Sequence, residues 1–298
     1  MTCQQKTASP RARSINSAQF SLVWTQQSQT RSNFGNLNSV SNRLKRLLEE
    51  MSPQSWFITG ATRGVGLAVV KQLLTTQSDS IVFAGARNPT TATSLKDLVA
   101  SYPSRLHIVK LDSTSAEDAK KAAAYVEKTT DGLDYVLANA GYVEPSQQKF
   151  LEEVSTAAIK EHFEVNTVGP IILFQALYPL LLKRQTRKFI AVSTVLSSMA
   201  IKLPSLAVPD SPYTLSKAAL NFLVVKIAAE YKQKGVIALA VHPGLIETGN
   251  YWKEFAKQTG FPTITTAQSA EGLVKLIMEA TAEQSGRFWN FDGKEFQY

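Results

Sequence analysis

Residues 56–74 read WFITGATRGVGLAVVKQLL, in which a short apolar run passes through a glycine-rich turn into a helical pattern. The turn, residues 59–66, carries glycines at positions 60, 64 and 66. Glycine allows a tight turn and close approach of the backbone to a ligand, and the first N–H groups of a helix suit a phosphate. Glycine-rich turns also occur without any ligand. The position of this one between a strand and a helix favours a nucleotide site.

The same rhythm of apolar run and helical pattern continues outward from this turn. Strands are predicted at 56–59, 81–86, 106–112, 135–140, 188–193 and 237–243, and helices at 64–75, 116–129, 153–182 and 212–234. The strands lack strict alternation of apolar and polar residues, which is typical of strands covered on both faces. We therefore predict an α/β fold, a Rossmann-type doubly wound parallel sheet flanked by helices, in a single domain that covers residues 51–298.

Residues 1–50 differ in composition from the rest of the chain. They are rich in Ser, Gln, Asn and Arg and contain no acidic residue before Glu49. This composition is typical of a disordered tail or of an organellar transit peptide. Because Met51 directly precedes the first strand, an internal start there is a third interpretation. We favour a disposable or misassigned segment over a targeting signal, since its apolar runs are short, and N-terminal sequencing of the native protein would decide.

The net charge of +8 does not indicate a nucleic-acid-binding surface. Residues 1–50 hold seven basic and two acidic residues, a net charge of +5, which leaves only +3 for the other 248 residues. A surface adapted to phosphate backbones needs clustered cations. We expect no nucleic-acid partner.

Cysteine and histidine usage argues against disulfides and metals. The single cysteine, Cys3, permits no intrachain disulfide, and the three histidines are far apart in sequence, so we expect no metal site. A reducing, cytoplasmic location fits best, although residues 1–50 leave organellar import open. The apolar run at 171–182 is shorter than the roughly 20 residues of a membrane span and contains Pro179, so we expect no membrane span.

The spacing of the glycine turn is similar to the TGxxxGxG pattern of the classical short-chain dehydrogenases/reductases. This resemblance implies that the turn binds a nicotinamide dinucleotide through Gly60, Thr62, Arg63, Gly64, Val65 and Gly66. Asp112 matches the residue of the family that meets the adenine amino group, although it could simply cap the following helix. Asn139 and Gly141 resemble part of the family's NNAG element, with Ala138 in place of its first asparagine.

The end of the second strand favours NADP over NAD. It reads Ala84-Gly85-Ala86-Arg87-Asn88 and lacks the carboxylate that an NAD-binding protein places there to bind the ribose hydroxyls. Arg87, together with Arg63 in the glycine turn, could bind a 2′-phosphate. The alternative is that both arginines are solvated loop residues. We predict NADP (NADPH) as the cofactor.

Tyr213 and Lys217 lie one helical turn apart and face the same side. A nearby ammonium stabilises a phenolate and lowers the pKa of a tyrosine. This spacing is common by chance, and it gains weight from the motifs that precede it in the family's order. The resemblance implies that Tyr213 and Lys217 are catalytic and also contact the cofactor, and that Asn166 holds a water connecting the lysine to solvent.

The resemblance also calls for a hydroxyl just after the fifth strand, where the family commonly has Ser-Ser. This chain reads Ser193-Thr194-Val195-Leu196-Ser197-Ser198. Alignment at the strand end puts Thr194 at the position that polarises the substrate carbonyl. Ser193 is the second candidate, and Ser197 is a third if the loop folds back. The segment from Thr194 to Tyr213 is longer than in compact members, which fits an inserted loop around LPSLAVPD.

After the sixth strand, residues 242–248 read HPGLIET, similar to the family's PGxxxT element. The resemblance implies contacts to the nicotinamide side from Pro243, Gly244, Ile246 and Thr248. The next segment carries aromatic residues where the family places a mobile substrate lid: Tyr251, Trp252, Phe255 and Phe261. The tail SGRFWNFDGKEFQY resembles the C-terminal strand of small carbonyl reductases, including fungal ketoreductases.

Together these motifs predict that NADPH reduces a ketone or aldehyde, with Tyr213 as the proton donor. The aromatic segment favours an apolar or aromatic small molecule, in a setting such as secondary metabolism. Two alternatives remain: an NADP-dependent alcohol oxidation, and a binding protein that senses NADP(H) without turnover. The long apolar helices at 153–182 and 212–234 also predict a homo-oligomer.

Overall fold

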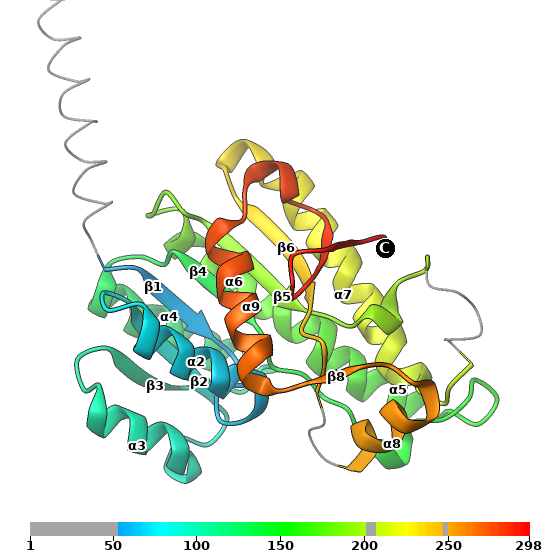
Figure 1. The fold of residues 1–298 in the computed structure, drawn as a ribbon. Helices are drawn as coiled ribbons and strands as arrows, with labels where there is room; N and C mark the ends of the chain where they lie inside the picture. The colour runs from blue at the N-terminus through cyan, green and yellow to red at the C-terminus, as the bar shows by residue number, and fades with distance from the viewer. Residues whose placement is uncertain (1–52, 201–206, 247–249) are drawn as a thin grey trace, which may run out of the picture. The chain divides into compact units, whose positions relative to one another are not determined.

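The computed structural model describes residues 53–200, 207–246 and 250–298 (Figure 1). Their centre is an eight-stranded sheet in the order β10-β9-β6-β5-β4-β1-β2-β3. The strands are β1 (Ser55–Ile58), β2 (Ile81–Ala86), β3 (Leu106–Lys110), β4 (Tyr135–Ala138), β5 (Lys188–Val192), β6 (Ile237–His242), β9 (Phe288–Asn290) and β10 (Glu295–Phe296). All neighbours run parallel except β9 and β10. This is the predicted Rossmann-type α/β fold.

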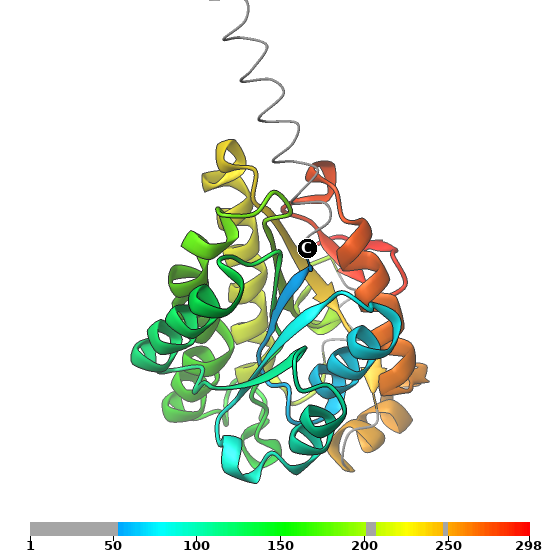
Figure 2. The same cartoon turned by 90° about the vertical axis from the view of Figure 1, so that its left-hand side faces the viewer.

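Helices cover both faces of the sheet. They are α2 (Gly64–Thr76), α3 (Thr93–Ser101), α4 (Ala116–Thr130), α5 (Thr156–Phe163), α6 (Gly169–Leu181), α7 (Ser211–Glu230), α8 (Asn250–Thr259) and α9 (Thr266–Glu279). Figure 2 shows α4, α6 and α7 on one side of the sheet, and α2 and α9 on the other. A second sheet pairs β7 (Leu245–Ile246) with β8 (Thr263–Ile264).

The strands bury side chains on both faces, as their continuous apolar sequences require. In β1, Trp56 and Ile58 pack into the core cluster on the side of α2 and α9, whereas Phe57 packs into the cluster beneath α4, α6 and α7. All three side chains are fully buried. Because the central strands are parallel, their carboxyl ends lie at one common edge of the sheet.

The chain reverses its direction of winding beside β1. This strand pairs with β2 on one side and with β4 on the other, so the crossover connections leave it in opposite directions. In open parallel sheets ligands bind at the carboxyl ends of the strands, at this switch point. The glycine turn lies there, because it directly follows β1.

Two predicted helices are shorter than expected. The segment 153–182 does not form one helix: Ser155 caps α5 by accepting a hydrogen bond from the Ala158 amide, and a π-helical turn, Glu164–Val168, separates α5 from α6. The predicted helix 212–234 ends at Glu230 and continues as a 3₁₀ turn, which stops at Gly235 with φ of +71°. The prediction named no helix at 93–101, 250–259 or 266–279.

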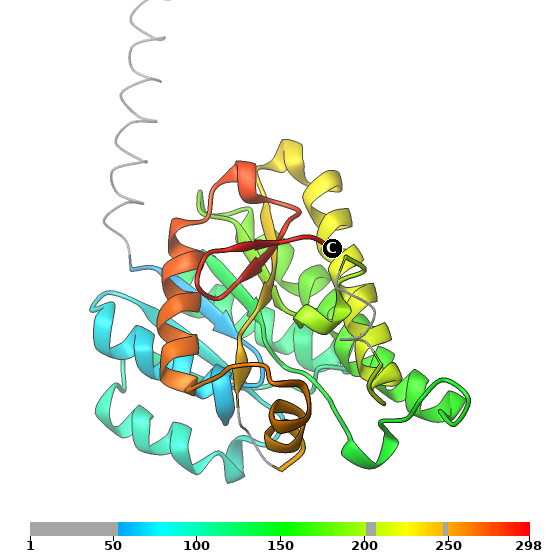
Figure 3. The same ribbon diagram turned by 45° about the vertical axis from the view of Figure 1, so that its right-hand side comes forward.

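The strands predicted at 106–112, 135–140 and 237–243 each end one or two residues early, where the chain leaves the sheet to form the cleft. The C-terminal strand suggested by the tail is present as the hairpin β9–β10 beside β6 (Figure 3). Residues 1–52 lie outside the described residues, so the structure does not test the prediction that residues 1–50 are a disposable segment.

Candidate active site

One long cleft follows the carboxyl edge of the sheet. Its lining comes from the glycine turn, the loops after β2, β3, β4 and β5, the start of α7 and part of α8. Fifteen of the residues predicted from the sequence line it together: Gly60, Thr62, Arg63, Gly64, Val65, Arg87, Asp112, Asn139, Gly141, Ser193, Tyr213, Lys217, Pro243, Trp252 and Phe255. The structure therefore brings most of the predicted cofactor and catalytic residues into a single groove. The residues that line it do not include Gly66, Asn166, Thr194, Gly244 and Ile246.

The glycines of the turn are required by its geometry. Gly60 has φ of +62°, and a Cβ there would lie 2.9 Å from the Cα atom of Ala140. A Cβ on Gly66 would lie 2.4 Å from the carbonyl oxygen of Gly60 and 2.6 Å from Nδ2 of Asn139. A side chain is therefore excluded at Gly60 and at Gly66, and the backbone there can be approached closely.

The N-terminus of α2 has no side-chain cap. Arg63 occupies the N-cap position in extended conformation and accepts no hydrogen bond through its side chain. By contrast, Ser115 caps α4 and Thr265 caps α9. The first N–H groups of α2 have no intrahelical partner, and the N-terminal end of the helix dipole is positive. This end of the helix therefore suits a pyrophosphate.

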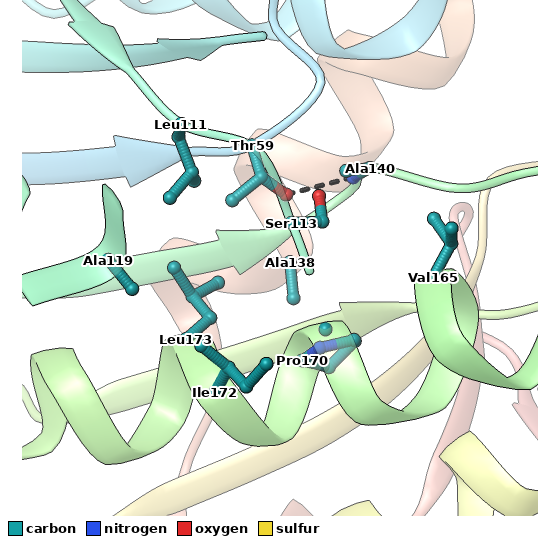
Figure 4. Close-up of a pocket in the computed structure, with 11 residues that line it drawn as sticks. Thr59, Leu111, Ser113, Ala119, Ala138, Ala140, Val165, Pro170, Ile172 and Leu173 are labelled. Carbon is teal, nitrogen blue, oxygen red and sulfur yellow. Dashed lines mark hydrogen bonds between the residues drawn. The ribbon is translucent and has the colours of Figure 1, made fainter. Parts of the chain in front are cut away.

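Asn139 joins the end of β4 to the glycine turn. Its Nδ2 donates to the Thr59 carbonyl oxygen at 2.9 Å and to that of Gly60 at 3.3 Å. The Ala140 amide donates to Oγ1 of Thr59 at 2.8 Å (Figure 4). Ala138, which replaces an asparagine of the family pattern, lies in a small, largely apolar pocket against α6, where an unpaired amide would be costly. The substitution leaves the contacts of Asn139 in place.

Asp112 lies at the end of the cleft beside Arg87. Its Oδ1 accepts hydrogen bonds from the amide and the hydroxyl of Thr114, at 3.1 and 2.9 Å. The backbone hydrogen bond from Thr114 is the main reason that the pKa of Asp112 is lowered, and Arg87 lowers it further. Asp112 does not cap the helix, because Ser115 does. Arg63 and Arg87 are both exposed.

Tyr213 and Lys217 both lie on α7 and face the cleft. Lys217 is buried, and its Nζ donates to the carbonyl oxygen of Val192 at 2.8 Å. Burial lowers the pKa of Lys217 to about 8. Nζ lies 6.0 Å from the centre of the Tyr213 ring. The ammonium of Lys217 thus lies beside the phenol of Tyr213. Among the described residues, no carboxylate forms an ion pair with Lys217.

Asn166 lies in the π-helical turn and is fully buried. Its Oδ1 accepts from the Tyr142 amide at 2.7 Å, and its Nδ2 donates to the Tyr142 carbonyl oxygen at 2.9 Å and to Oγ of Ser216 at 3.0 Å. A Cβ on Gly141 would lie 3.5 Å from both Asn166 Oδ1 and Lys217 Nζ. Asn166 therefore sits near the lysine and fixes the loop after β4.

The three candidate hydroxyls after β5 occupy different surroundings. Ser193 lines the cleft, and its Oγ lies 3.1 Å from that of Ser197. Thr194 begins a 3₁₀ turn (Val195–Ser197) and accepts from the Leu196 amide at 3.3 Å. All three hydroxyl-bearing residues are buried. The loop does fold back, as one interpretation of the sequence required, because Ser197 returns to Ser193.

The predicted nicotinamide-side residues are described only in part. Pro243 lines the cleft, and Gly244 has φ of +85° with Ile264 packed close against it. Ile246 lies in β7, half-buried, and is not among the residues that line the cleft. Thr248 lies outside the described residues.

Aromatic side chains close one end of the cleft. The Trp252 ring stands edge-on to the Tyr213 ring, with centroids 5.8 Å apart. Phe255 contacts Trp252 at 5.7 Å and stacks on Phe261 at 6.3 Å. Val208 and Pro209, from the inserted segment before α7, line the same cleft. These side chains form an apolar surface suited to flat rings, and Glu254 and Gln258 of α8 also line the cleft.

Sequence reasoning missed several residues that hold the site together. Ser216 bridges Asn166 and the Tyr213 carbonyl oxygen, to which it donates at 2.7 Å. Tyr142 supplies only backbone groups to Asn166, so its identity carried no signal. Asn221 donates to Ser197 at 2.8 Å. The only sequence signal for a role of Asn221 in the site is its position one helical turn beyond Lys217.

The described residues contain no helix long and apolar enough to cross a membrane. Across those same residues, no group of three or more His, Cys, Asp or Glu side chains could hold a metal ion.

The fold and the cleft define an oxidoreductase of the Rossmann type. The chain belongs to the short chain dehydrogenase family, whose model matches residues 54–259. A short-chain dehydrogenase of Neurospora crassa, srdF, is 36% identical over 247 residues, which cover 80% of this chain and 95% of that protein. An oxidoreductase of Schizosaccharomyces pombe is 34% identical over 254 residues, covering 80% of this chain and 95% of the relative.

Solved structures with the same fold include carbonyl reductases. The NADPH-bound carbonyl reductase from chicken fatty liver superposes with a TM-score of 0.73 at 28% identity, covering 83% of this chain and 100% of the other. The carbonyl reductase Sniffer of Drosophila melanogaster superposes with a TM-score of 0.73 at 25% identity, with the same coverage.

Proposed function

We propose that this protein uses NADPH to reduce a ketone or aldehyde on an apolar or aromatic small molecule. The observation that carries the proposal is the arrangement of Tyr213 and Lys217 on α7 in the same cleft as the glycine turn and the end of β5. Each of these features is common alone. Their convergence on one groove supports a proton donor next to a bound dinucleotide.

The surroundings of the turn fit a dinucleotide. The uncapped α2 N-terminus and the excluded Cβ positions at Gly60 and Gly66 suit a pyrophosphate. Arg63 and Arg87 line the cleft beside it, and β2 ends without a carboxylate, which favours the 2′-phosphate of NADP. The NADPH in the structure of the chicken carbonyl reductase is further support for this choice.

The chain's own residues would supply the proton and the polarisation. When bound, NADPH supplies a hydride from C4 of its nicotinamide ring. Tyr213 donates its phenolic proton to the carbonyl oxygen, and the Lys217 ammonium stabilises the phenolate that remains. A hydroxyl from Thr194 or Ser193 donates a hydrogen bond to the same oxygen, where negative charge develops. Asn166 keeps the loop after β4 in place beside Lys217.

The apolar end of the cleft supports the proposed substrate class. Trp252 lies against Tyr213, so a substrate whose carbonyl reaches the phenol would also contact the indole. Phe255, Val208 and Pro209 extend this surface. A ring system of secondary metabolism would bury more apolar area here than a small polar carbonyl compound.

NADPH consumption against a panel of aromatic, polyketide-like and small polar ketones tests the proposal. We expect turnover of apolar aromatic ketones, and loss of turnover by at least about 100-fold in Tyr213→Phe with NADPH binding retained. Faster NADP reduction with the matching alcohols at neutral pH would favour alcohol oxidation. Tight NADPH binding with no turnover, unchanged in Tyr213→Phe, would favour a non-catalytic sensor.

Two further expectations belong to the proposal. Phe222 and Leu215 expose 66% and 43% of their surface on α7, which supports self-association through the long helices. The single cysteine, Cys3, supports a reducing, cytoplasmic location. Light scattering and fractionation of cells test these expectations separately.

A further inference from the structure

Helix α7 carries a third polar side chain in line with Tyr213 and Lys217. Asn221 follows Lys217 by four residues, as Lys217 follows Tyr213, so all three lie on the same side of the helix. Asn221 exposes only 3% of its surface and does not line the cleft. Its Nδ2 donates a 2.8 Å hydrogen bond to Oγ of Ser197, and its Oδ1 is buried with no hydrogen-bond partner among the described residues. A buried amide beneath the site is therefore connected to the loop that holds the candidate hydroxyls.

The hydrogen of Ser197 is already committed. Oγ of Ser197 donates to the carbonyl oxygen of Thr194 at 2.6 Å, and a serine hydroxyl has one hydrogen to donate. Toward Asn221 and toward Ser193 the same oxygen must therefore accept. The 3.1 Å contact between Ser193 and Ser197 is consequently donated by Ser193. The hydrogen of Ser193 is thus donated to Ser197.

Thr194 differs from Ser193 in this respect. Its Oγ1 accepts from the Leu196 amide at 3.3 Å, and no hydrogen bond among the described residues takes its own hydrogen. Its carbonyl oxygen accepts from Ser197, and two residues earlier the carbonyl oxygen of Val192 accepts from Lys217. Two side chains of α7 thus fix the backbone on either side of the candidate hydroxyls, one directly and the other through Ser197.

We propose that Asn221 and Ser197 are positioning residues of the active site. They direct the Ser193 hydrogen inward and hold the Thr194 backbone, so that Thr194 is the hydroxyl that polarises the substrate carbonyl. This inference rests on the proposed function. Neither residue touches substrate or cofactor, and both act through the turn after β5.

The test compares single and double variants of the network. Thr194→Ala is expected to lower kcat by about 100-fold or more, as loss of a hydrogen-bond donor to a developing oxyanion does. Ser193→Ala is expected to change kcat by less than about fivefold, because that hydroxyl already donates elsewhere. The reverse order of effects would overturn the assignment of Thr194.

Asn221→Leu and Ser197→Ala are each expected to lower kcat by about tenfold or more, the scale of a misplaced catalytic group. The Kd of NADPH, measured by fluorescence titration, should stay within about twofold of wild type, since the cofactor turn is untouched. The double variant should lose no more than the worse single variant, because the two residues act as one unit. Additive losses, or single losses under about twofold, would refute the positioning role.

Controls separate this inference from folding and from the proposed function. Lys226→Gln alters an exposed side chain farther along α7 and should leave kcat unchanged. If Asn221→Leu does not fold, Ser197→Ala carries the test alone, as it removes a single oxygen. Wild type that turns over no carbonyl compound would defeat the proposed function, whereas active wild type with fully active variants would defeat only the positioning role.

Discussion

Nζ of Lys217 donates a 2.8 Å hydrogen bond to the carbonyl oxygen of Val192, the last residue of β5. This contact ties the helix that carries Tyr213 to the strand that leads into the candidate hydroxyls. It also brings an ammonium group into a site where the lysine is only 3% exposed. Lys217 therefore both supplies a positive charge to the site and fixes α7 to the end of β5.

The same burial predicts an alkaline limit to activity. Burial lowers the pKa of Lys217 to about 8, so the ammonium that stabilises the phenolate is lost as the pH rises through that value. We expect kcat/KM for NADPH-dependent reduction to be level below pH 8 and to fall by about tenfold per pH unit above it. Steady-state kinetics from pH 6 to 10 provide the measurement. A level profile up to pH 10 would contradict the assignment.

Arg87 predicts the cofactor preference. Arg87→Asp places a carboxylate where an NAD-binding protein has one and removes a cation from the 2′-phosphate side of the cleft. We expect the KM for NADPH to rise at least about tenfold, which corresponds to ~1.4 kcal/mol, and the KM for NADH to fall or stay constant. Lys71→Glu, an exposed change on α2 with the same loss of positive charge, is the control. Equal effects on both cofactors would disprove the preference.

The close packing around Gly66 leaves no room for a side chain at that position of the glycine turn. A Cβ at this position would lie 2.4 Å from the Gly60 carbonyl oxygen, so Gly66→Ala must displace the backbone that faces the cofactor. We expect a weaker Kd for NADPH by at least about tenfold and a lower Tm. Gly293→Asn is the matched control, because Gly293 lies outside the cleft and has φ of +86° with open space around it, and asparagine tolerates that conformation. Similar effects of both changes would argue against the steric explanation.

Asp210 predicts an unusual dependence of stability on pH. Its carboxyl group, three residues before Tyr213, is buried, and its Oδ2 has no hydrogen-bond partner among the described residues. Burial raises its pKa to about 7. Between pH 4 and 7 the unfolded chain releases this proton while the folded chain keeps it, so the contribution of Asp210 to stability falls as the pH rises.

Asp210→Asn should therefore stabilise the protein at pH 8, by up to about 4 kcal/mol, and should have little effect at pH 4. Urea unfolding of both proteins at the two pH values measures the difference. Asp97→Asn, an exposed carboxylate on α3, should show no such dependence. A stabilisation of equal size at pH 4 and pH 8 would rule out ionisation of Asp210 as its cause.

The strands of the sheet could be predicted from the sequence because a parallel strand buried on both faces is a continuous apolar run bounded by turn residues. The sequence also predicted the glycine turn after β1, where a Cβ at Gly60 or Gly66 would collide with neighbouring atoms. The π-helical turn between α5 and α6 was missed because residues 164–168 have no proline or glycine and are typical of an ordinary helix. Nothing in a helical sequence pattern distinguishes the i→i+4 hydrogen bonds of an α-helix from the i→i+5 bonds of a π turn.

The candidate hydroxyls could not be ranked from the sequence for a different reason. Ser193, Thr194 and Ser197 are chemically alike, and what separates them is which acceptor each hydrogen meets. That depends on Asn221, which is 24 residues from Ser197 and reaches it only through the packing of α7 against the end of β5. The choice is thus made by tertiary structure rather than by local spacing.

The π-helical turn at Glu164–Val168 has a consequence for how this region can vary. Removing one residue there would allow an uninterrupted α-helix, yet it would rotate everything on one side of the deletion by about 100° relative to the other. Asn166 would then turn away from Tyr142 and Ser216. Across related chains, substitutions in this turn should be tolerated far more often than single-residue insertions or deletions.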